Sequence, residues 1–228
     1  MEPNALADGR ILCGDIDLAI LSADGATKQV IIKQPGGVSF KNPKMSPDER
    51  FVAYDDDVST TPSVYVVETA TGKRVAKFGN MTDALFSHPA WAPDGSLVFQ
   101  GATFNFNKSP GLYRVDSAFA HMERIDKGLN LPASPAVSPD GRRIAFLLNG
   151  RVWTMNVDGT MATQLKSPDL DQAFPTWSPD GKRVMASTNN CDLAALDAAG
   201  GAFIKVSDKV PMIANAFGTC ADGPMTWR

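Results

Sequence analysis

The sequence predicts an all-β fold, a five-bladed β-propeller built from four-stranded antiparallel blades. Three observations predict it. A Pro-Asp turn recurs along the whole chain, a short apolar segment follows each copy of the turn, and a second apolar segment recurs between the copies. A repeat of about 40 residues with this content is typical of propeller blades.

The turn motif reads Ser-Pro-Asp-Gly in its best copies. The five copies are Ser46-Pro47-Asp48-Glu49, Ala92-Pro93-Asp94-Gly95, Ser138-Pro139-Asp140-Gly141, Ser178-Pro179-Asp180-Gly181 and the degenerate Cys220-Ala221-Asp222-Gly223. Their aspartates are 46, 46, 40 and 42 residues apart. Proline presets φ in such a turn, aspartate accepts hydrogen bonds from nearby backbone amides, and glycine adopts positive φ. These aspartates are therefore predicted to be structural. Trp91, Val137 and Trp177, just before the turn, supply bulk between blades.

Two apolar strands recur in each repeat. The strands that follow the turn are Phe51-Val52-Ala53-Tyr54, Leu97-Val98-Phe99, Ile144-Ala145-Phe146, Val184-Met185-Ala186 and Met225-Thr226-Trp227. The second set is Leu18-Ala19-Ile20-Leu21, Val64-Tyr65-Val66-Val67, Leu112-Tyr113-Arg114-Val115, Val152-Trp153-Thr154-Met155 and Leu193-Ala194-Ala195-Leu196. A turn such as Asp24-Gly25 or Asp158-Gly159 and a further strand follow, which gives four strands per repeat.

The blade boundaries follow once the strands are named a to d from the channel outward, with the Pro-Asp turn joining a to b. Residues 1–228 form one domain with four complete blades, at about 38–80, 85–127, 132–167 and 172–207. Residues 14–35 supply strands c and d of a fifth blade, and residues 213–228 supply its strands a and b. Both termini then close the ring and satisfy its strand edges. The alternative is a piece of a ring with six to eight blades.

Composition excludes several classes of protein. The 228 residues are 43% hydrophobic and 21% charged, with a net charge of −3, so no basic field attracts nucleic acid. No apolar run reaches the length of about 18 residues that a membrane-spanning helix needs. The sequence as given begins without the basic and apolar segments of a signal peptide. We expect one large domain that does not span a membrane.

The repeat resembles that of a known family. The copies at Val137–Phe146 and Trp177–Ala186 are similar to the WD-type propeller repeat of TolB and its relatives, and the resemblance covers the chain from about Asp15 to Arg228. It implies a bacterial protein that is periplasmic or secreted. The family includes periplasmic scaffolds, sensor domains and the propeller portions of peptidases and polysaccharide lyases. No catalytic residue is carried over, because the matching positions are structural turn residues.

Two function classes remain open. The sequence contains no Gly-x-Ser-x-Gly, no His-Glu-x-x-His, no phosphate-binding glycine loop and no Cys-x-x-Cys. This favours a non-catalytic binding or scaffolding propeller that presents one face to a protein or a carbohydrate. The alternative is a glycoside hydrolase or polysaccharide lyase with carboxylates at the channel mouth. The oligomeric state is not specified by the sequence.

One face of the disc is predicted to bind the partner, because the b–c and d–a loops emerge there and vary in length. The b–c loop at residues 100–110 is long and alternates phenylalanine with amides, so Phe104 and Phe106 are the predicted anchors. The candidate contact residues on this face are Phe40, Phe86, His88, Phe104, Asn105, Phe106 and Phe174. The alternatives are that about half of the phenylalanines before strand a pack between blades, and that His88 caps backbone groups.

The same face carries a candidate cation site. Asp55, Asp56 and Asp57 precede three hydroxyl residues in a b–c loop, and oxygen ligands of this kind suit Ca²⁺. Adjacent residues of an extended chain point to opposite sides, however, so a solvated acidic loop is the alternative. No other cofactor is expected.

The three cysteines leave one unpaired. Cys13 and Cys191 both fall in b–c connections of neighbouring blades, so they form the candidate disulfide in an oxidising compartment. Cys220 belongs to the opposite face. The alternative is that all three are reduced, buried residues.

Overall fold

The computed structural model describes residues 2–6, 8–14, 16–33, 39–56, 62–79, 85–102, 110–167, 172–188 and 192–206. All regular secondary structure in these residues is β-strand, in five antiparallel sheets of four strands each. The predicted all-β fold is confirmed. The described residues contain no helix, hence none long and apolar enough to cross a membrane.

The four strands of each sheet follow one another in the chain and pair with their sequence neighbours. In chain order the sheets are β1 (Glu2–Ala5), β2 (Ile11–Gly14), β3 (Leu18–Leu21) and β4 (Lys28–Ile32); β5 (Phe40–Met45), β6 (Phe51–Asp56), β7 (Val64–Glu68) and β8 (Arg74–Phe78); β9 (Leu85–Trp91), β10 (Leu97–Ala102), β11 (Gly111–Val115) and β12 (Met122–Arg124); β13 (Ala133–Val137), β14 (Arg143–Leu148), β15 (Arg151–Asn156) and β16 (Thr163–Gln164); β17 (Gln172–Trp177), β18 (Arg183–Thr188), β19 (Leu193–Asp197) and β20 (Ile204–Lys205). We call them the first to the fifth sheet.

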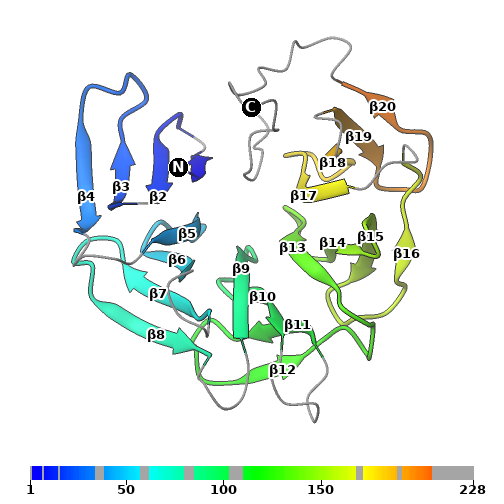
Figure 1. Ribbon diagram of the computed structural model, residues 1–228, viewed down its shortest axis with the longest axis horizontal. Helices are drawn as coiled ribbons and strands as arrows, with labels where there is room; N and C mark the ends of the chain where they lie inside the picture. Colours follow the sequence, from blue (N-terminus) through cyan, green and yellow to red (C-terminus); the bar gives the residue numbers. More distant parts are fainter. Residues whose placement is uncertain are drawn as a thin grey trace.

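The sheets are arranged around a common centre. Figure 1 shows that strands β1, β5, β9, β13 and β17 lie nearest the centre, whereas β4, β8, β12, β16 and β20 lie at the outside. The four strands of each sheet are therefore named a to d, from the centre outward. Because the strands alternate in direction, the a–b and c–d turns share one face, and the b–c and d–a connections share the other.

The first sheet corrects one prediction. Strands β3 and β4 were expected to pair with residues 213–228, but β2 pairs with β3, and β1 with β2. The inner half of this sheet therefore comes from residues 2–14, which precede β3 directly in the chain. A short connection makes this pairing local. Residues 213–228 lie outside the described residues, so closure of the ring stays a prediction.

The core lies between the sheets. Consecutive residues of strand β6 face opposite sides: Val52 and Tyr54 pack on Leu12 and Leu18 of the first sheet, whereas Ala53 packs on Phe99 of the third. Both faces of the sheet are covered, so its b and c strands read as continuous apolar runs instead of alternating ones. Similar layers join the third sheet to the fourth and the fourth to the fifth.

The Pro-Asp turns have the predicted structural role. In the fourth sheet the Ser138 hydroxyl donates to Asp140 Oδ1 at 2.6 Å, and the same oxygen accepts from Arg142 N at 3.0 Å. The third sheet has Ala92 in place of this serine. There Ser96 donates its hydroxyl to Asp94 Oδ1 at 2.6 Å. The turn aspartate thus has a serine hydroxyl as a partner in both sheets. The serine comes two residues before the aspartate in the fourth sheet and two residues after it in the third.

These hydrogen bonds give the first testable prediction. The Ser138 hydroxyl and the Arg142 amide hold the pKa of Asp140 below its usual value. Asp140→Ala is expected to lower the free energy of unfolding by about 1 kcal/mol at neutral pH. A lowered pKa stabilises the fold above the unfolded-state pKa of about 3.9, and this stabilisation is lost as pH falls through the folded-state pKa. The difference between the two proteins in urea unfolding should therefore shrink below about pH 4. A difference independent of pH would contradict this role.

Tryptophan and arginine side chains join neighbouring sheets at the same turns. Trp91 Nε1 donates to Lys44 O in the preceding sheet, and Trp177 Nε1 donates to Ala136 O, each at 2.9 Å. Arg143 lies over the Trp177 ring, with 4.7 Å from Cζ to the ring centroid, and donates to two backbone carbonyls of the fifth sheet. The tryptophans thus lie between neighbouring sheets, as their place before the turn predicted.

Candidate functional site

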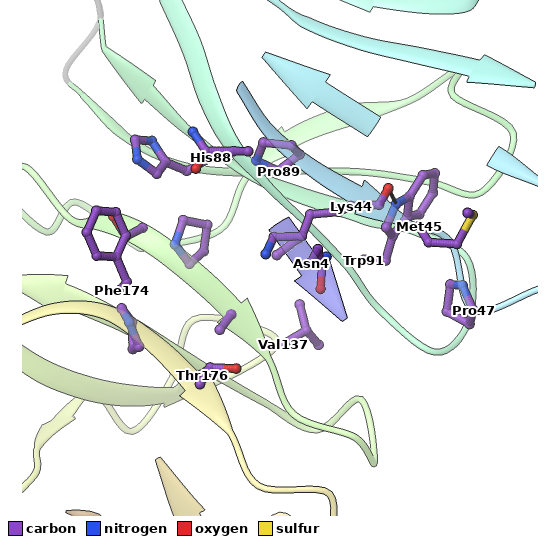
Figure 2. A pocket seen from close by; sticks show the side chains of 16 residues that line it. Asn4, Lys44, Met45, Pro47, His88, Pro89, Trp91, Val137, Phe174 and Thr176 are labelled. Atoms are coloured by element: carbon purple, nitrogen blue, oxygen red, sulfur yellow. Dashed lines mark hydrogen bonds between the residues drawn. The ribbon is translucent and has the colours of Figure 1, made fainter. Parts of the chain in front are cut away.

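A cavity of about 300 Å³ is lined by residues from the innermost strand of every sheet. Its lining residues are Asn4, Asn42, Lys44, Met45, Pro47, His88, Pro89, Ala90, Trp91, Ser134, Pro135, Ala136, Val137, Phe174, Pro175 and Thr176. Figure 2 shows His88 and Phe174 toward one end, Met45 and Pro47 toward the other, and Lys44 and Asn4 between them. Every sheet thus contributes to one shared channel wall.

The wall is built from a repeated bulge. Asn42, His88, Ser134 and Phe174 occupy equivalent places in four inner strands, each has a φ between 46° and 55°, and each is followed by proline. The strand register shifts at or beside each of these four positions. A bulge re-aims the side chain of its extra residue. The four bulges therefore display four different side chains around one channel.

Two of these bulges are hydrogen-bonded to a side chain of the preceding sheet. Asp55 bonds to the bulge at His88, and Gln100 bonds to the bulge at Ser134. Asp55, which is 3% exposed, accepts from His88 N at 2.6 Å through Oδ2, and from Asn42 Nδ2 at 3.1 and 3.2 Å. Gln100 has the equivalent place in the next sheet, and its Oε1 accepts from Ser134 N at 3.2 Å. Asp55 therefore ties the second sheet to the third directly beside the cavity.

The acidic run divides between two environments. Asp56 accepts from Ser63 N at 3.0 Å and from the Tyr65 hydroxyl at 2.9 Å, on the other side of the strand from Asp55. Burial, together with this hydrogen bond to Asp56, raises the pKa of Tyr65. No cluster of three metal-ligating side chains occurs in the part of the chain that the structure describes. Asp57 lies outside that part, so the Ca²⁺ site stays untested.

The phenylalanines that were expected just before strand a lie within it and separate into two kinds. Phe40 and Phe86 are 2% and 4% exposed, and Phe86 packs against Phe99 at 4.9 Å between ring centroids. Their assignment to an exposed contact face was wrong, because the pleat of the strand turns both rings into the core between sheets. Phe174 instead occupies the bulge position and lines the cavity.

His88 lies inside β9, and not in the loop before it. Its Nδ1 is 3.0 Å from Ser87 Oγ, its backbone amide donates to Asp55, and it lines the cavity together with Phe174. The structure thus brings two predicted contact residues to the same channel. Phe104, Asn105 and Phe106 lie outside the described residues, and their role stays a prediction.

Cys13 lies in strand β2, and not in a b–c connection. The residue is 7% exposed and carries a free thiol, whose pKa is raised by burial. Cys191, its predicted disulfide partner, lies outside the described residues. Cys13 therefore has the environment of a small buried core residue.

Sequence reasoning missed Asn4, Asn42, Lys44 and Ser134 as lining residues. The missed signal is a second repeat, in which a variable residue and a proline precede the Pro-Asp turn by a fixed number of residues. Asn4 adds a link of its own, because its Nδ2 donates to Pro43 O at 3.2 Å and so joins the first sheet to the second.

The chain is similar to proteins of known name over most of its length. A family model described as the TolB beta propeller domain matches residues 13–209. The Tol-Pal system protein TolB of Francisella tularensis subsp. mediasiatica (strain FSC147) is 26% identical over 204 residues, which are 84% of this chain and 46% of that protein. The protein TolB homolog of Chlorobium chlorochromatii (strain CaD3) is 39% identical over 107 residues, which are 46% of this chain and 22% of that protein.

The fold has a counterpart among solved structures. The putative TolB from Agrobacterium tumefaciens superposes with a TM-score of 0.73 at 21% identity, over 90% of this chain and 79% of that one. The chain spans less than half the length of the two curated relatives described above. Because the family model matches most of the residues, the chain belongs to the TolB β-propeller domain family.

Proposed function

We propose that this chain is a non-catalytic propeller that binds a partner protein through the central channel and the face of the b–c and d–a connections. The observation that carries this proposal is the set of four bulges. At this one structural position the sheets present asparagine, histidine, serine and phenylalanine to a shared cavity. The four Pro-Asp turns on the other face keep nearly the same residues. Variation at one face of a constant scaffold is typical of a binding surface.

The cavity lining favours binding over catalysis by paired carboxylates. None of the described residues that line the cavity is aspartate or glutamate. Asp55, the described carboxylate that hydrogen-bonds to two bulge residues, is buried behind the wall. A glycoside hydrolase or lyase with acids at this channel mouth finds no support in the described residues.

The names of the relatives indicate the kind of partner. The Francisella protein is named as a component of the Tol-Pal system. We infer that the partner is a protein of that system and that the chain acts in the bacterial periplasm. Phe104 and Phe106 are kept as predicted anchors on the same face. Truncation of anchors of this kind typically weakens binding by tenfold or more.

We also infer that the five sheets are consecutive blades of one propeller ring. Each sheet shares a core layer with the next one, and the tryptophan and arginine links recur between sheets. Arg183 has the place in the fifth sheet that Arg143 has in the fourth. Its Nη1 is buried and has no hydrogen-bond partner within the described residues. This favours a further neighbour on that side of the fifth sheet.

A pair of crosslinking variants tests the binding face. The photoreactive residue p-benzoylphenylalanine is placed at Phe174, in the channel, or at Lys182, in an a–b turn on the opposite face. After irradiation of the producing bacterium, a Tol-Pal protein should crosslink to position 174 and not to position 182, as mass spectrometry would show. Equal labelling from both positions, or labelling from position 182 alone, would contradict the proposed face.

A further inference from the structure

We propose that residues 207–228 lie between the fifth sheet and the first, that they cover the face of each sheet that turns away from its described neighbour, and that Trp227 packs on Cys13. Figure 1 shows the fifth and first sheets at the two ends of an arc, with no described strand between them. The described chain ends at Val206, directly after β20 in the fifth sheet, and the 22 residues 207–228 follow. This segment therefore starts beside one of the two faces.

The outward face of the fifth sheet is buried. Val184 and Ala186 pack on the fourth sheet, so Met185 between them points to the other side. Its partner across the strands, Ala195, points the same way. Both residues are at most 8% exposed, and neither belongs to one of the four core layers that join described sheets. Their burial requires a covering layer on this side of the sheet.

The outward face of the first sheet has the same property. Leu12 and Ile20 pack on the second sheet, so Cys13 and Ala19, which face each other across β2 and β3, point away from it. Cys13 and Ala19 are 7% and 1% exposed. A thiol and a methyl group occupy little space. This face therefore suits a large side chain from the segment that covers it.

The repeat identifies that side chain. Ala53 and Ala145 come five residues after their turn aspartates, and both pack on the sheet that follows. Trp227 comes five residues after the aspartate of the last copy of the turn, so the same spacing directs it away from the fifth sheet and onto Cys13. Ala53 packs on Phe99 of the third sheet, so a small and a large side chain already share one such layer. Trp227 and Cys13 combine the same two sizes in the reverse order.

The a–b turns supply two further contacts for the segment. Arg143 donates to Gly181 O in the next sheet at 3.0 Å, whereas Arg183, at the equivalent place, has a buried Nη1 without a partner among the described residues. A Cβ at Gly181 would lie 3.9 Å from Cδ of the turn proline in the preceding sheet. By the same repeat, Arg183 donates to the Gly223 carbonyl, and Gly223 lies beside Pro179.

An exchange of side-chain sizes in the whole chain tests the contact between Cys13 and Trp227. Cys13→Phe should lower the melting temperature by about 6 °C, because the added ring overpacks a filled space. When Trp227→Ala is also present, Cys13→Phe should instead raise the melting temperature, because the new ring fills the cavity that the indole leaves. The double variant has one small and one large side chain, as at Ala53 and Phe99. An equal shift from Cys13→Phe in both backgrounds would overturn the contact.

A thiol crosslink tests the position of the segment, and it decides the proposal even where a size-exchange variant does not fold. In a chain whose three native cysteines are replaced by alanine, Pro179→Cys and Gly223→Cys should be joined within one chain by bismaleimidoethane. Pro139→Cys with Gly181→Cys is the matched control, because that contact lies within the described residues. Electrophoresis and peptide mass spectrometry identify the product. If only the control pair reacts, or if the product joins two chains, the proposal is wrong.

Discussion

Gly159→Ala is expected to lower the free energy of unfolding by about 3 kcal/mol, whereas Gly25→Ala is expected to lower it by about 1 kcal/mol. Both glycines lie in c–d turns, with φ of 78° and 72°. The backbone strain of an alanine at positive φ is therefore about the same at either position. At Gly25 a Cβ would meet no atom of the described residues within 4 Å, but at Gly159 it would collide with the carbonyl oxygen of Ile125 in the preceding sheet.

Equilibrium unfolding in urea would measure both variants, and Gly72→Ala provides an independent repeat. Gly72 has a φ of 67°, and its Cβ would collide with the Ile31 carbonyl in the same way. The difference between Gly159→Ala and Gly25→Ala isolates the contact between sheets from the strain of positive φ. Equal losses for the two variants would show that the c–d turns do not press on the neighbouring sheet.

Asp55→Ala is expected to lower the free energy of unfolding by about 3 kcal/mol, because it removes a charged acceptor from the part-buried donors of Asn42 and His88. Asp55→Asn keeps one acceptor oxygen and should lose less, about 1 kcal/mol. Gln100→Ala, at the equivalent place in the next sheet, removes one bond to Ser134 N and should also lose about 1 kcal/mol.

Thermal and urea unfolding of the three variants would test this order. If Asp55→Ala were as mild as Gln100→Ala, water would be satisfying the donors and the link between the second and third sheets would be weak. A selective loss of partner binding in Asp55→Asn, with unchanged stability, would instead give this carboxylate a direct role in the site.

The sequence predicted the four later sheets because each carries a complete signal. A proline and an aspartate mark the turn, and apolar runs mark strands b and c, which are buried on both faces. The inner half of the first sheet lacks that signal. Its a–b turn is Asp8-Gly9, where Asp8 Oδ1 accepts from Arg10 N at 3.0 Å, as the other turn aspartates do, but no Ser-Pro precedes it. Strand β1 has no apolar alternation, so local pattern could not identify it.

The candidate site was predicted less well because a bulge changes which side chains face the channel. Phe40, Phe86 and Phe174 look alike as phenylalanines near the start of strand a. In three dimensions Phe40 and Phe86 lie two residues before the bulge and point into the core, whereas Phe174 is the bulge residue itself. Alternation counted from the loop gives the wrong face once an extra residue enters the strand.

The two tryptophan links have a consequence for how such proteins diverge. Trp91 and Trp177 bond to the carbonyls of Lys44 and Ala136, which occupy equivalent places in their strands and whose side chains line the cavity. A main-chain acceptor is present whatever the side chain is. Lysine can therefore stand at this position in one sheet and alanine in another, while the tryptophan makes the same hydrogen bond between sheets. A substitution at this position can therefore change the surface of the cavity without removing the hydrogen bond between the two sheets.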